Sequence, residues 1–253
     1  MITCFHTFWR RDNIISKYQI KFIVLAATFI AWVTPAMAGW RPGPESESIP
    51  ASISGYYGIA SYNMGDLNKL IELTNAGSSL IDPIGNGTEY GGRLTFHFNQ
   101  QMSAGFSYSA IQASTAYGSV GSDQYLEINA KGSLMEASLT YKDDLSPKLA
   151  WGLTGAIGRI SANGHLDLED PETEIHYEFL GSSMSVSANA LIEYQMSRST
   201  YIWLEAGLRQ ADTGTVKNAG RPWTLPDGQK ISFSYSGAFL RVGLSLSSLF
   251  LEG

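Results

Sequence analysis

The chain has 253 residues and carries 17 Lys and Arg against 23 Asp and Glu, a net charge of −6. An acidic chain of this kind argues against binding to nucleic acid and against a polybasic membrane-surface binder. The only cysteine, Cys4, stands near the start of the chain, which excludes a disulfide framework. The length suffices for one domain of ordinary size.

The first 38 residues have the organisation of an export signal. Four basic residues precede an apolar run at 22–33, which ends before Pro35. This run of 12 residues is shorter than the roughly 20 that a membrane-spanning helix needs, and a small-residue motif predicts cleavage between Ala38 and Gly39. After cleavage 13 Lys and Arg remain against 22 Asp and Glu, so the exported chain has a net charge of −9.

Residues 39–50 are rich in Pro, Ser and Glu and predict a flexible lead-in. The domain is predicted at 51–250, where polar and apolar side chains alternate along eight segments. This alternation is the pattern of β-strands with one apolar and one polar face. The eight predicted strands are 52–62, 88–98, 102–110, about 124–141, 148–160, 183–195, 201–209 and 238–250. The apolar phase switches near Lys131-Gly132 and near Gly237, which predicts β-bulges there.

The connections between these segments alternate in length. Short turns on one side and long loops on the other are typical of a bacterial outer-membrane barrel with both chain ends in the periplasm, an arrangement that needs an even number of strands. The short gaps are 99–101, 142–147 and 196–199, and the long ones are 63–87, 114–123, 161–182 and 210–229.

Two of the long loops contain structure of their own. Residues 66–74 have apolar side chains at helical spacing after a plausible cap at Asn63 or Asp66, which predicts a short helix over one mouth of the barrel. The loop 161–182 has a hairpin pattern, with two leucines facing three apolar residues across 170–173. Strands five and six are therefore expected to continue beyond the membrane.

The polar faces of the strands carry ionised side chains of both signs, whereas the apolar faces carry none at mid-strand. A polar face in water would be expected to hold many lysines, but lysine is scarce in these segments. Arg and Glu among Ser, Gly and Asn suit a narrow interior in which charges pair. We therefore predict that the apolar face meets lipid and that the lumen is closed by salt bridges. The predicted lumen residues are Glu89, Arg93, Glu136, Glu193, Glu205, Arg209 and Arg241.

Over residues 51–250 the chain resembles the small eight-stranded outer-membrane barrels of the OmpA/OmpX type. The resemblance rests on the eight alternating segments, the connection lengths and a last strand that ends in an aromatic, Phe250. It departs from the pattern at 251–253, because such barrels usually end on the aromatic itself. Aromatic residues near the strand ends are predicted to form interfacial girdles, and these are Tyr56, Tyr57, Tyr62, Phe98, Tyr141, Tyr194, Tyr201 and Trp203.

The resemblance implies an all-β fold, an antiparallel up-and-down transmembrane barrel of eight strands, in the outer membrane of a Gram-negative cell. Its expected partners are outer-membrane lipid and lipopolysaccharide, the barrel assembly machinery, and a protein bound at the long loops. We expect a monomer with a structural or surface-interaction role, without cofactor or metal, that does not bind nucleic acid.

Other classes of function remain open at this stage. A lipid A modifying enzyme would need a Ser-His-acid group, and the exported chain has only His97, His165 and His176. A gated ion path through the lumen would make the protein a small porin, and a soluble periplasmic barrel would bind an apolar ligand. The acidic stretch 167–174 lacks the glycine-interrupted spacing of a calcium loop, so we interpret it as a hydrated loop.

Overall fold

A computed structural model of the chain describes residues 51–75, 81–113, 116–120, 124–169 and 174–247. The predicted signal and lead-in, the turn 170–173 and Phe250 lie outside the described residues. In chain order the described elements are β1 (Ala51–Ser61), α2 (Gly65–Asn75), β2 (Asn86–His97), β3 (Met102–Ala113), β4 (Ala116–Val120), β5 (Gln124–Ser146), β6 (Leu149–Glu169), β7 (Glu174–Gln195), β8 (Thr200–Thr215), β9 (Lys217–Asn218), β10 (Arg221–Pro222), β11 (Ser232–Ser234) and β12 (Gly237–Ser247).

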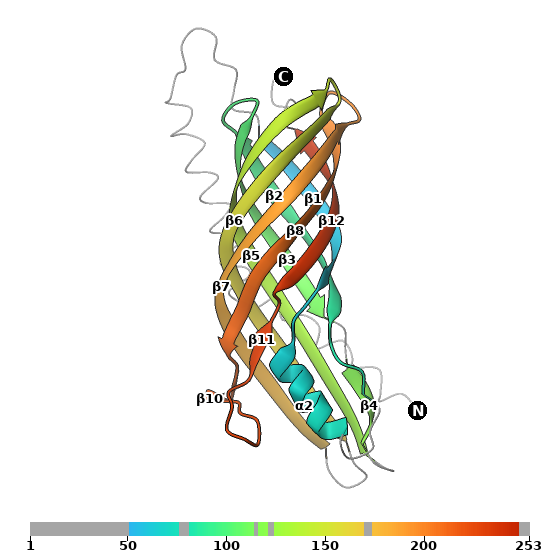
Figure 1. Cartoon of the computed structure of the whole chain (residues 1–253), viewed down its shortest axis with the longest axis vertical. Coiled ribbons are helices and arrows are strands. Elements are labelled where there is room, and N and C mark those ends of the chain that lie inside the picture. The colour runs from blue at the N-terminus through green and yellow to red at the C-terminus, as the bar shows by residue number, and fades with distance from the viewer. Residues whose placement is uncertain (1–50, 76–80, 114–115, 121–123, 170–173, 248–253) are drawn as a thin grey trace, which may run out of the picture. The chain divides into compact units, whose positions relative to one another are not determined.

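Eight antiparallel strands close into a ring (Figure 1). Its order is β1, β2, β3, β5, β6, β7, β8 and β12, and β12 pairs back to β1. A closed ring leaves no unpaired strand edge around the barrel, which is why a sheet can exist in lipid at all. The predicted eight-stranded up-and-down barrel with a short helix is confirmed.

The two ends of the barrel differ in their connections. Tight turns at 98–101, 147–148 and 196–199 join strands at one end, which we call the short-turn end. The helix α2 and the long connections lie at the other, the loop end (Figure 1). The turn predicted at 142–147 is shorter than expected, because β5 stays paired with β6 as far as Ser146.

The strands β5, β6 and β7 are much longer than a membrane requires. They have 23, 21 and 22 residues, against about 9–11 for a strand that crosses a bilayer. β6 pairs with β7 up to Glu169 and Glu174, so most of the segment 161–182 is strand, as its hairpin pattern predicted. β4 adds a short arm to β5 inside 116–120, which the sequence did not indicate.

Three serines mark the level at which the apolar side chains of these long strands change from the outward face to the inward face. Ser133, Ser161 and Ser182 lie opposite one another on β5, β6 and β7, and we call them the serine row. Between the serine row and the short-turn end, large apolar side chains point outward and are exposed around the ring. This membrane belt includes Ile53, Tyr57, Ile59, Tyr90, Phe106, Leu139, Leu153, Ile157, Met184, Val186, Ile192, Leu204, Leu208, Leu240, Val242 and Leu244.

Beyond the serine row the same strands turn their apolar side chains inward. Ile128, Ala130 and Phe179 are fully buried, whereas the outward neighbours Lys131 and Asn163 are exposed. We call this part, residues 124–132, 162–169 and 174–181, the projecting sheet.

The bulge predicted near Lys131-Gly132 is absent from the pairing of β5 with β6, which runs through both residues without a register shift. On the other side of β5, the pairing with β3 ends at Lys131 and β4 takes over from Ile128. The phase of the pattern switches because the surroundings change from lipid to water, not because a residue is inserted. Near the second predicted bulge, the register shift lies between Ser232 and Ser234 of β11, slightly before Gly237.

The inward side chains of the projecting sheet pack with α2 and with the segment that carries β11. Asp66 accepts hydrogen bonds from the backbone N–H of Ser232 at 2.9 Å and from its hydroxyl at 2.7 Å, which ties the first turn of α2 to β11. α2 has 11 residues, and no helix of the described ranges is long and apolar enough to cross a membrane. We call the buried cluster the loop-end core, and it includes Met64, Leu67, Ile71, Ile81, Ile84, Ile128, Leu134, Ile160, Phe179, Ile231, Phe233 and Tyr235.

Candidate functional site

Six ionised side chains meet inside the barrel, between the short-turn end and the loop-end core. They come from four strands, because the strand pairing aligns their inward positions. β2 provides two of them, β5 one, β8 two and β12 one. We call this group the lumen network, and it consists of Glu89, Arg93, Glu136, Glu205, Arg209 and Arg241.

Arg241 is the hub of the lumen network. Its Nε donates to Glu89, its Nη1 donates to Oε1 of Glu205 at 3.0 Å, and its Nη2 lies 3.9 Å from Oε2 of Glu136. Both Nη atoms of Arg209 donate to Oε2 of Glu89 at 3.0 Å. Each hub contact is therefore a charge-assisted hydrogen bond or a close ion pair.

Arg93 completes the network from the side of the short-turn end. Its Nη2 donates to Oε2 of Glu205 at 2.8 Å, and Glu136 accepts a hydrogen bond from the Ser187 hydroxyl at 3.1 Å. Three arginines face three glutamates, so the network is balanced in charge. Glu89 and Glu205 are 0% exposed, and charges buried this deeply are stable only when they are paired and hydrogen-bonded.

Aromatic rings cover the guanidinium groups of the network. The Arg241 guanidinium carbon lies 4.2 Å from the ring centroid of Phe239 and 5.2 Å from that of Tyr56, and Arg93 lies 5.1 Å from Trp203. Tyr56, Tyr62 and Trp203 are buried, so their prediction as girdle residues is wrong. They stand in the polar phase of their strands, and that phase, rather than their closeness to a strand end, was the signal that could have placed them inside.

Two inward glycines make room for the charged stems. A Cβ on Gly58 would lie 2.8 Å from Cγ of Arg241, and a Cβ on Gly158 would lie 2.8 Å from Cγ of Glu136. Neither side chain could keep its position beside a larger residue. The sequence signal is a glycine in the inward phase, opposite a charged residue on the neighbouring strand.

Glu193, which the sequence grouped with the others, lies apart from the lumen network near the short-turn end. It accepts a hydrogen bond from Nζ of Lys142 at 2.9 Å. Lys142 was missed because it fell in a predicted turn. These two residues, with His97 and Arg93, line a small polar vestibule of about 30 Å³, room for roughly two water molecules.

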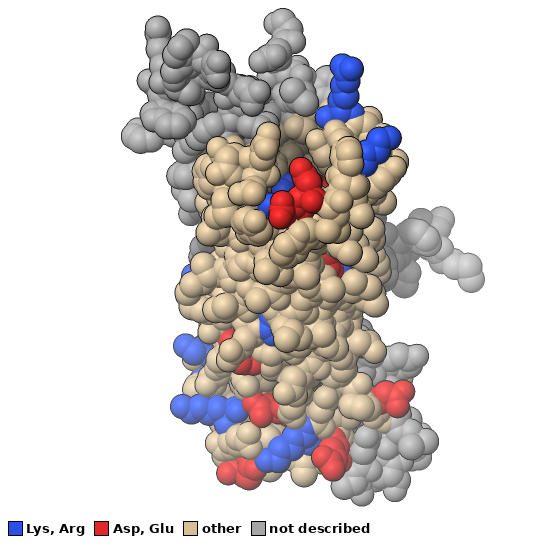
Figure 2. All heavy atoms as spheres, turned by 45° about the horizontal axis from the view of Figure 1, so that its top comes forward, with Lys and Arg blue, Asp and Glu red and all other residues tan. Residues whose placement is uncertain are grey.

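The vestibule opens at the short-turn end. Figure 2 shows acidic and basic side chains inside a recess at this end of the barrel. His97 Nε2 lies 3.3 Å from the Ser52 hydroxyl. Within the described part of the chain, no carboxylate hydrogen-bonds to His97. The contact therefore lacks the third member of a Ser-His-acid group.

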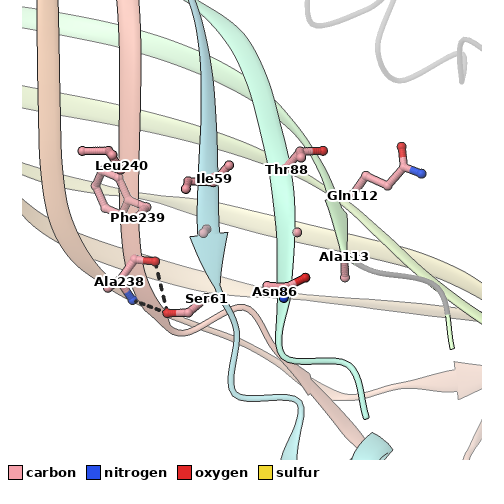
Figure 3. A pocket seen from close by; sticks show the side chains of 11 residues that line it. Ile59, Ser61, Asn86, Thr88, Gln112, Ala113, Ala238, Phe239 and Leu240 are labelled. Carbon is pink, nitrogen blue, oxygen red and sulfur yellow. Dashed lines mark hydrogen bonds between the residues drawn. The ribbon is translucent and has the colours of Figure 1, made fainter. Parts of the chain in front are cut away.

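A wide, open hollow of about 800 Å³ lies on the barrel wall where β1, β2, β3 and β12 end (Figure 3). The Ser61 hydroxyl bonds to the backbone N and O of Ala238 at 3.1 and 3.3 Å and fixes the end of β1 on β12. Its lining has no ionisable side chain and therefore offers no acid or base for chemistry. The lining residues are Ile59, Ala60, Ser61, Asn86, Gly87, Thr88, Gln112, Ala113, Ala238, Phe239 and Leu240.

The outward face of the projecting sheet carries the other two histidines, side by side. The rings of His165 and His176 are stacked with centroids 5.9 Å apart. Asp167 lies between them, hydrogen-bonded to Nδ1 of His176 and with Oδ2 3.8 Å from Nε2 of His165. The hydrogen bond to Asp167 raises the pKa of His176. Among the described residues, no group of three or more His, Asp and Glu side chains could hold a metal ion.

The fold and the lumen together define the class of the protein. An eight-stranded closed ring with an apolar outside and a buried, ionised interior is a transmembrane β-barrel of the bacterial outer-membrane type. Its place is therefore the outer membrane, with the membrane belt in lipid.

No protein-family model matches the sequence, and no curated protein matches it. Among solved structures, the chain is similar to the outer membrane protein OprG from Pseudomonas aeruginosa, with 10% identity and a TM-score of 0.49 over 79% of this chain and 96% of that one. It is similar to Ail of Yersinia pestis in complex with the heparin analogue sucrose octasulfate, with 11% identity and a TM-score of 0.43 over 79% and 99%. Neisserial surface protein A gives 12% identity and 0.41 over 78% and 96%.

Proposed function

We propose that the protein is a sealed outer-membrane barrel that acts through its loop end, as a structural or surface-interaction protein of the envelope. The observation that carries the proposal is the double closure of the interior. The lumen network fills the barrel with paired charges, and the loop-end core fills the space beyond it with apolar side chains. An interior closed in both ways leaves the outward surfaces as the functional part.

Conductance in a planar bilayer tests the seal. We expect no steady current from the reconstituted protein, because an eight-stranded barrel has just enough interior for its side chains. Insertion is verified separately by the heat-dependent gel shift of the recovered protein. Discrete current steps whose number grows with the amount of inserted protein would contradict the seal and favour the small-porin alternative.

The projecting sheet is the surface that we propose for interaction. Its outward face stands beyond the membrane belt and carries Glu127, Asp167 and Glu178 around the two stacked histidines. Long paired strands hold this face rigid, so a partner meets a preformed surface rather than a loop that has to be ordered.

Adhesion of cells tests the surface role. In the variant, a two-residue turn replaces the hairpin beyond Ser161 and Ser182, so the membrane belt and lumen network are kept. Cells that display the full protein should adhere to at least one of three probe surfaces, coated with fibronectin, collagen or heparin, and cells with the shortened protein should not. Equal adhesion of both, or of neither, would contradict the role.

The proposal includes no catalytic step. Both ring nitrogens of His176 face carboxylates, Asp167 and Glu178, and within the described residues no serine is hydrogen-bonded to either projecting histidine. Mass spectrometry of lipid A from cells with and without the protein checks this. A mass change that disappears in the His176→Ala variant would replace the proposal with the enzyme alternative.

A further inference from the structure

Two cations stand on the outside of the barrel at the level where the membrane belt ends. Lys131 on β5 and Arg159 on β6 are both exposed and point outward. Neither forms an ion pair within the described residues. An exposed cation without a carboxylate partner keeps its full charge for a ligand.

The strand register fixes the distance between the two cations. Lys131 lies opposite Asn163, and Arg159 is four residues from Asn163 on the same strand. At about 3.3 Å per residue, the two side chains start roughly 13 Å apart along the strands. The serine row lies between them, with Ser133 opposite Ser161.

Serine hydroxyl groups therefore line the space between the two cations. Ser161 lies opposite Ser182, and Nη2 of Arg159 donates to the Ser182 hydroxyl at 2.9 Å. This bond holds the exposed guanidinium beside the serine row. Arginine and hydroxyl groups are the donors that bind phosphate oxygens well.

The side chains on either side of the patch set its depth in the membrane. Toward the short-turn end the next outward residues are Ile157 and Met184, 53% and 63% exposed. Inside the barrel, Glu136 of the lumen network gives way at this level to Leu134 of the loop-end core. The patch thus lies at the boundary between the apolar membrane layer and water.

The wall beside β5 adds no further charge to the patch, and on the side of β7 the exposed Lys217 lies opposite Leu180. On β3, Gln112 lies opposite Lys131, and on β2, Thr88 lies opposite Gln112, so the neighbouring wall is polar and uncharged. A ligand that carries two negative charges and an apolar tail would find cations, hydroxyl groups and exposed apolar side chains together at this side of the ring.

We propose that this patch, formed by Lys131, Arg159 and the serine row, binds a phosphorylated lipid of the outer leaflet, of the lipopolysaccharide class. The phosphates contact the two cations and the serine hydroxyls, and the acyl chains follow Ile157 and Met184 along the barrel wall. The inference goes beyond the proposed surface role and rests on the proposed function, in which the loop end faces the cell surface.

Lipid titration followed by native mass spectrometry tests the patch, using the protein recovered from outer membranes in a zwitterionic detergent. The ligands are bisphosphorylated lipid A, the same lipid without its phosphates, and inorganic phosphate. The variant is Lys131→Gln with Arg159→Gln. Its matched control, Lys148→Gln with Arg198→Gln, removes one Lys and one Arg that are exposed at the short-turn end.

We expect the double variant to bind bisphosphorylated lipid A about tenfold or more weakly, and the control variant to bind like the wild type. Equal weakening in both variants, equal binding of the dephosphorylated lipid, or saturable binding of inorganic phosphate with similar affinity would each overturn the proposal. The heat-dependent gel shift of every variant is measured alongside. If the wild type shows the gel shift but binds lipid A with and without phosphates equally, the lipid site alone is refuted. If the wild type shows no gel shift, the membrane barrel itself is refuted.

Discussion

The two halves of the barrel on either side of the serine row place their apolar and polar side chains on opposite faces of the sheet. On the short-turn side, apolar side chains face outward and the interior is held by the lumen network. On the loop side, most outward side chains of the projecting sheet are polar, with Leu180 and Tyr125 exposed among them, and the interior is the loop-end core. The strands β5, β6 and β7 pass the serine row without a break in register.

The difference shows that the surroundings, and not the backbone, decide which face of a strand is apolar. In lipid no driving force buries apolar side chains inside the barrel, and polar groups there must find partners in the lumen. In water the hydrophobic effect again favours an apolar interior. A strand that crosses from one medium to the other therefore exchanges its faces near the boundary, as β5 and β6 do at the serine row.

Removal of the hub arginine should cause the largest effect on the membrane half. We expect Arg241→Ala to lower the free energy of unfolding by about 3–5 kcal/mol, because it leaves Glu89 and Glu205 buried without their shared partner. Urea titration in lipid vesicles measures the change. The matched substitution Arg198→Ala, at an exposed arginine of the short-turn end, should stay within about 0.5 kcal/mol. Similar losses for both would show that the network does not hold the barrel.

A cavity in the loop-end core should destabilise the half of the barrel beyond the serine row. Phe233 is 0% exposed, and Phe233→Ala is expected to destabilise that half by about 3–5 kcal/mol. Limited proteolysis should then cut beyond the serine row while the heat-dependent gel shift of the barrel persists. Phe98→Ala, at a ring that is 56% exposed, is the control. Loss of the gel shift together with the projecting sheet would contradict two separately held halves.

A charge placed on the outward face should distinguish the halves directly. Leu204, in the membrane belt, is 45% exposed, and Leu204→Arg is expected to cost about 2–4 kcal/mol because the charge enters lipid. Asn163→Arg, on the outward face of the projecting sheet, should change the stability by less than about 0.5 kcal/mol. Equal costs, measured by the same urea titration, would mean that both positions face the same medium.

The smallest expected effect on stability comes from the protonation of His176. Its pKa is raised by the hydrogen bond to Asp167, so the stabilising contribution is fully present below the ordinary pKa near 6.5 and is lost as the pH rises through the raised value. NMR titration of the histidine ring should show this, and Asp167→Asn should lower the pKa of His176. An unchanged pKa in the variant would refute the assigned cause.

Much of the fold could be predicted because alternation reports directly on strands. The eight segments, the turn and loop ends and the helix at 66–74 all follow from local patterns. What failed is the meaning of a phase switch, as at Lys131. A bulge and a change of medium leave the same trace in a sequence, and only the pairing partners tell them apart.

The lumen shows the same limit. The polar phase placed Glu89, Arg209 and Arg241 inside, but it could not say which charges meet, because partners stand on strands far apart in the sequence. The pairing of Glu193 with Lys142 rather than with the network depends on height along the barrel axis. Height follows from the shear of the ring, which no single strand encodes.

The most direct test of the central claim is a cysteine scan along the outward face of β7, at Val186, Met184, Ser182, Leu180 and Glu178. The single natural cysteine, Cys4, precedes the predicted cleavage site, so each variant would carry one thiol in the exported chain. Labelling of the membrane-inserted protein by a water-soluble maleimide should be slow at Val186 and Met184 and fast from Ser182 onward. A uniform rate along the strand, or a transition on the far side of Glu178, would contradict an exchange of faces at the membrane boundary.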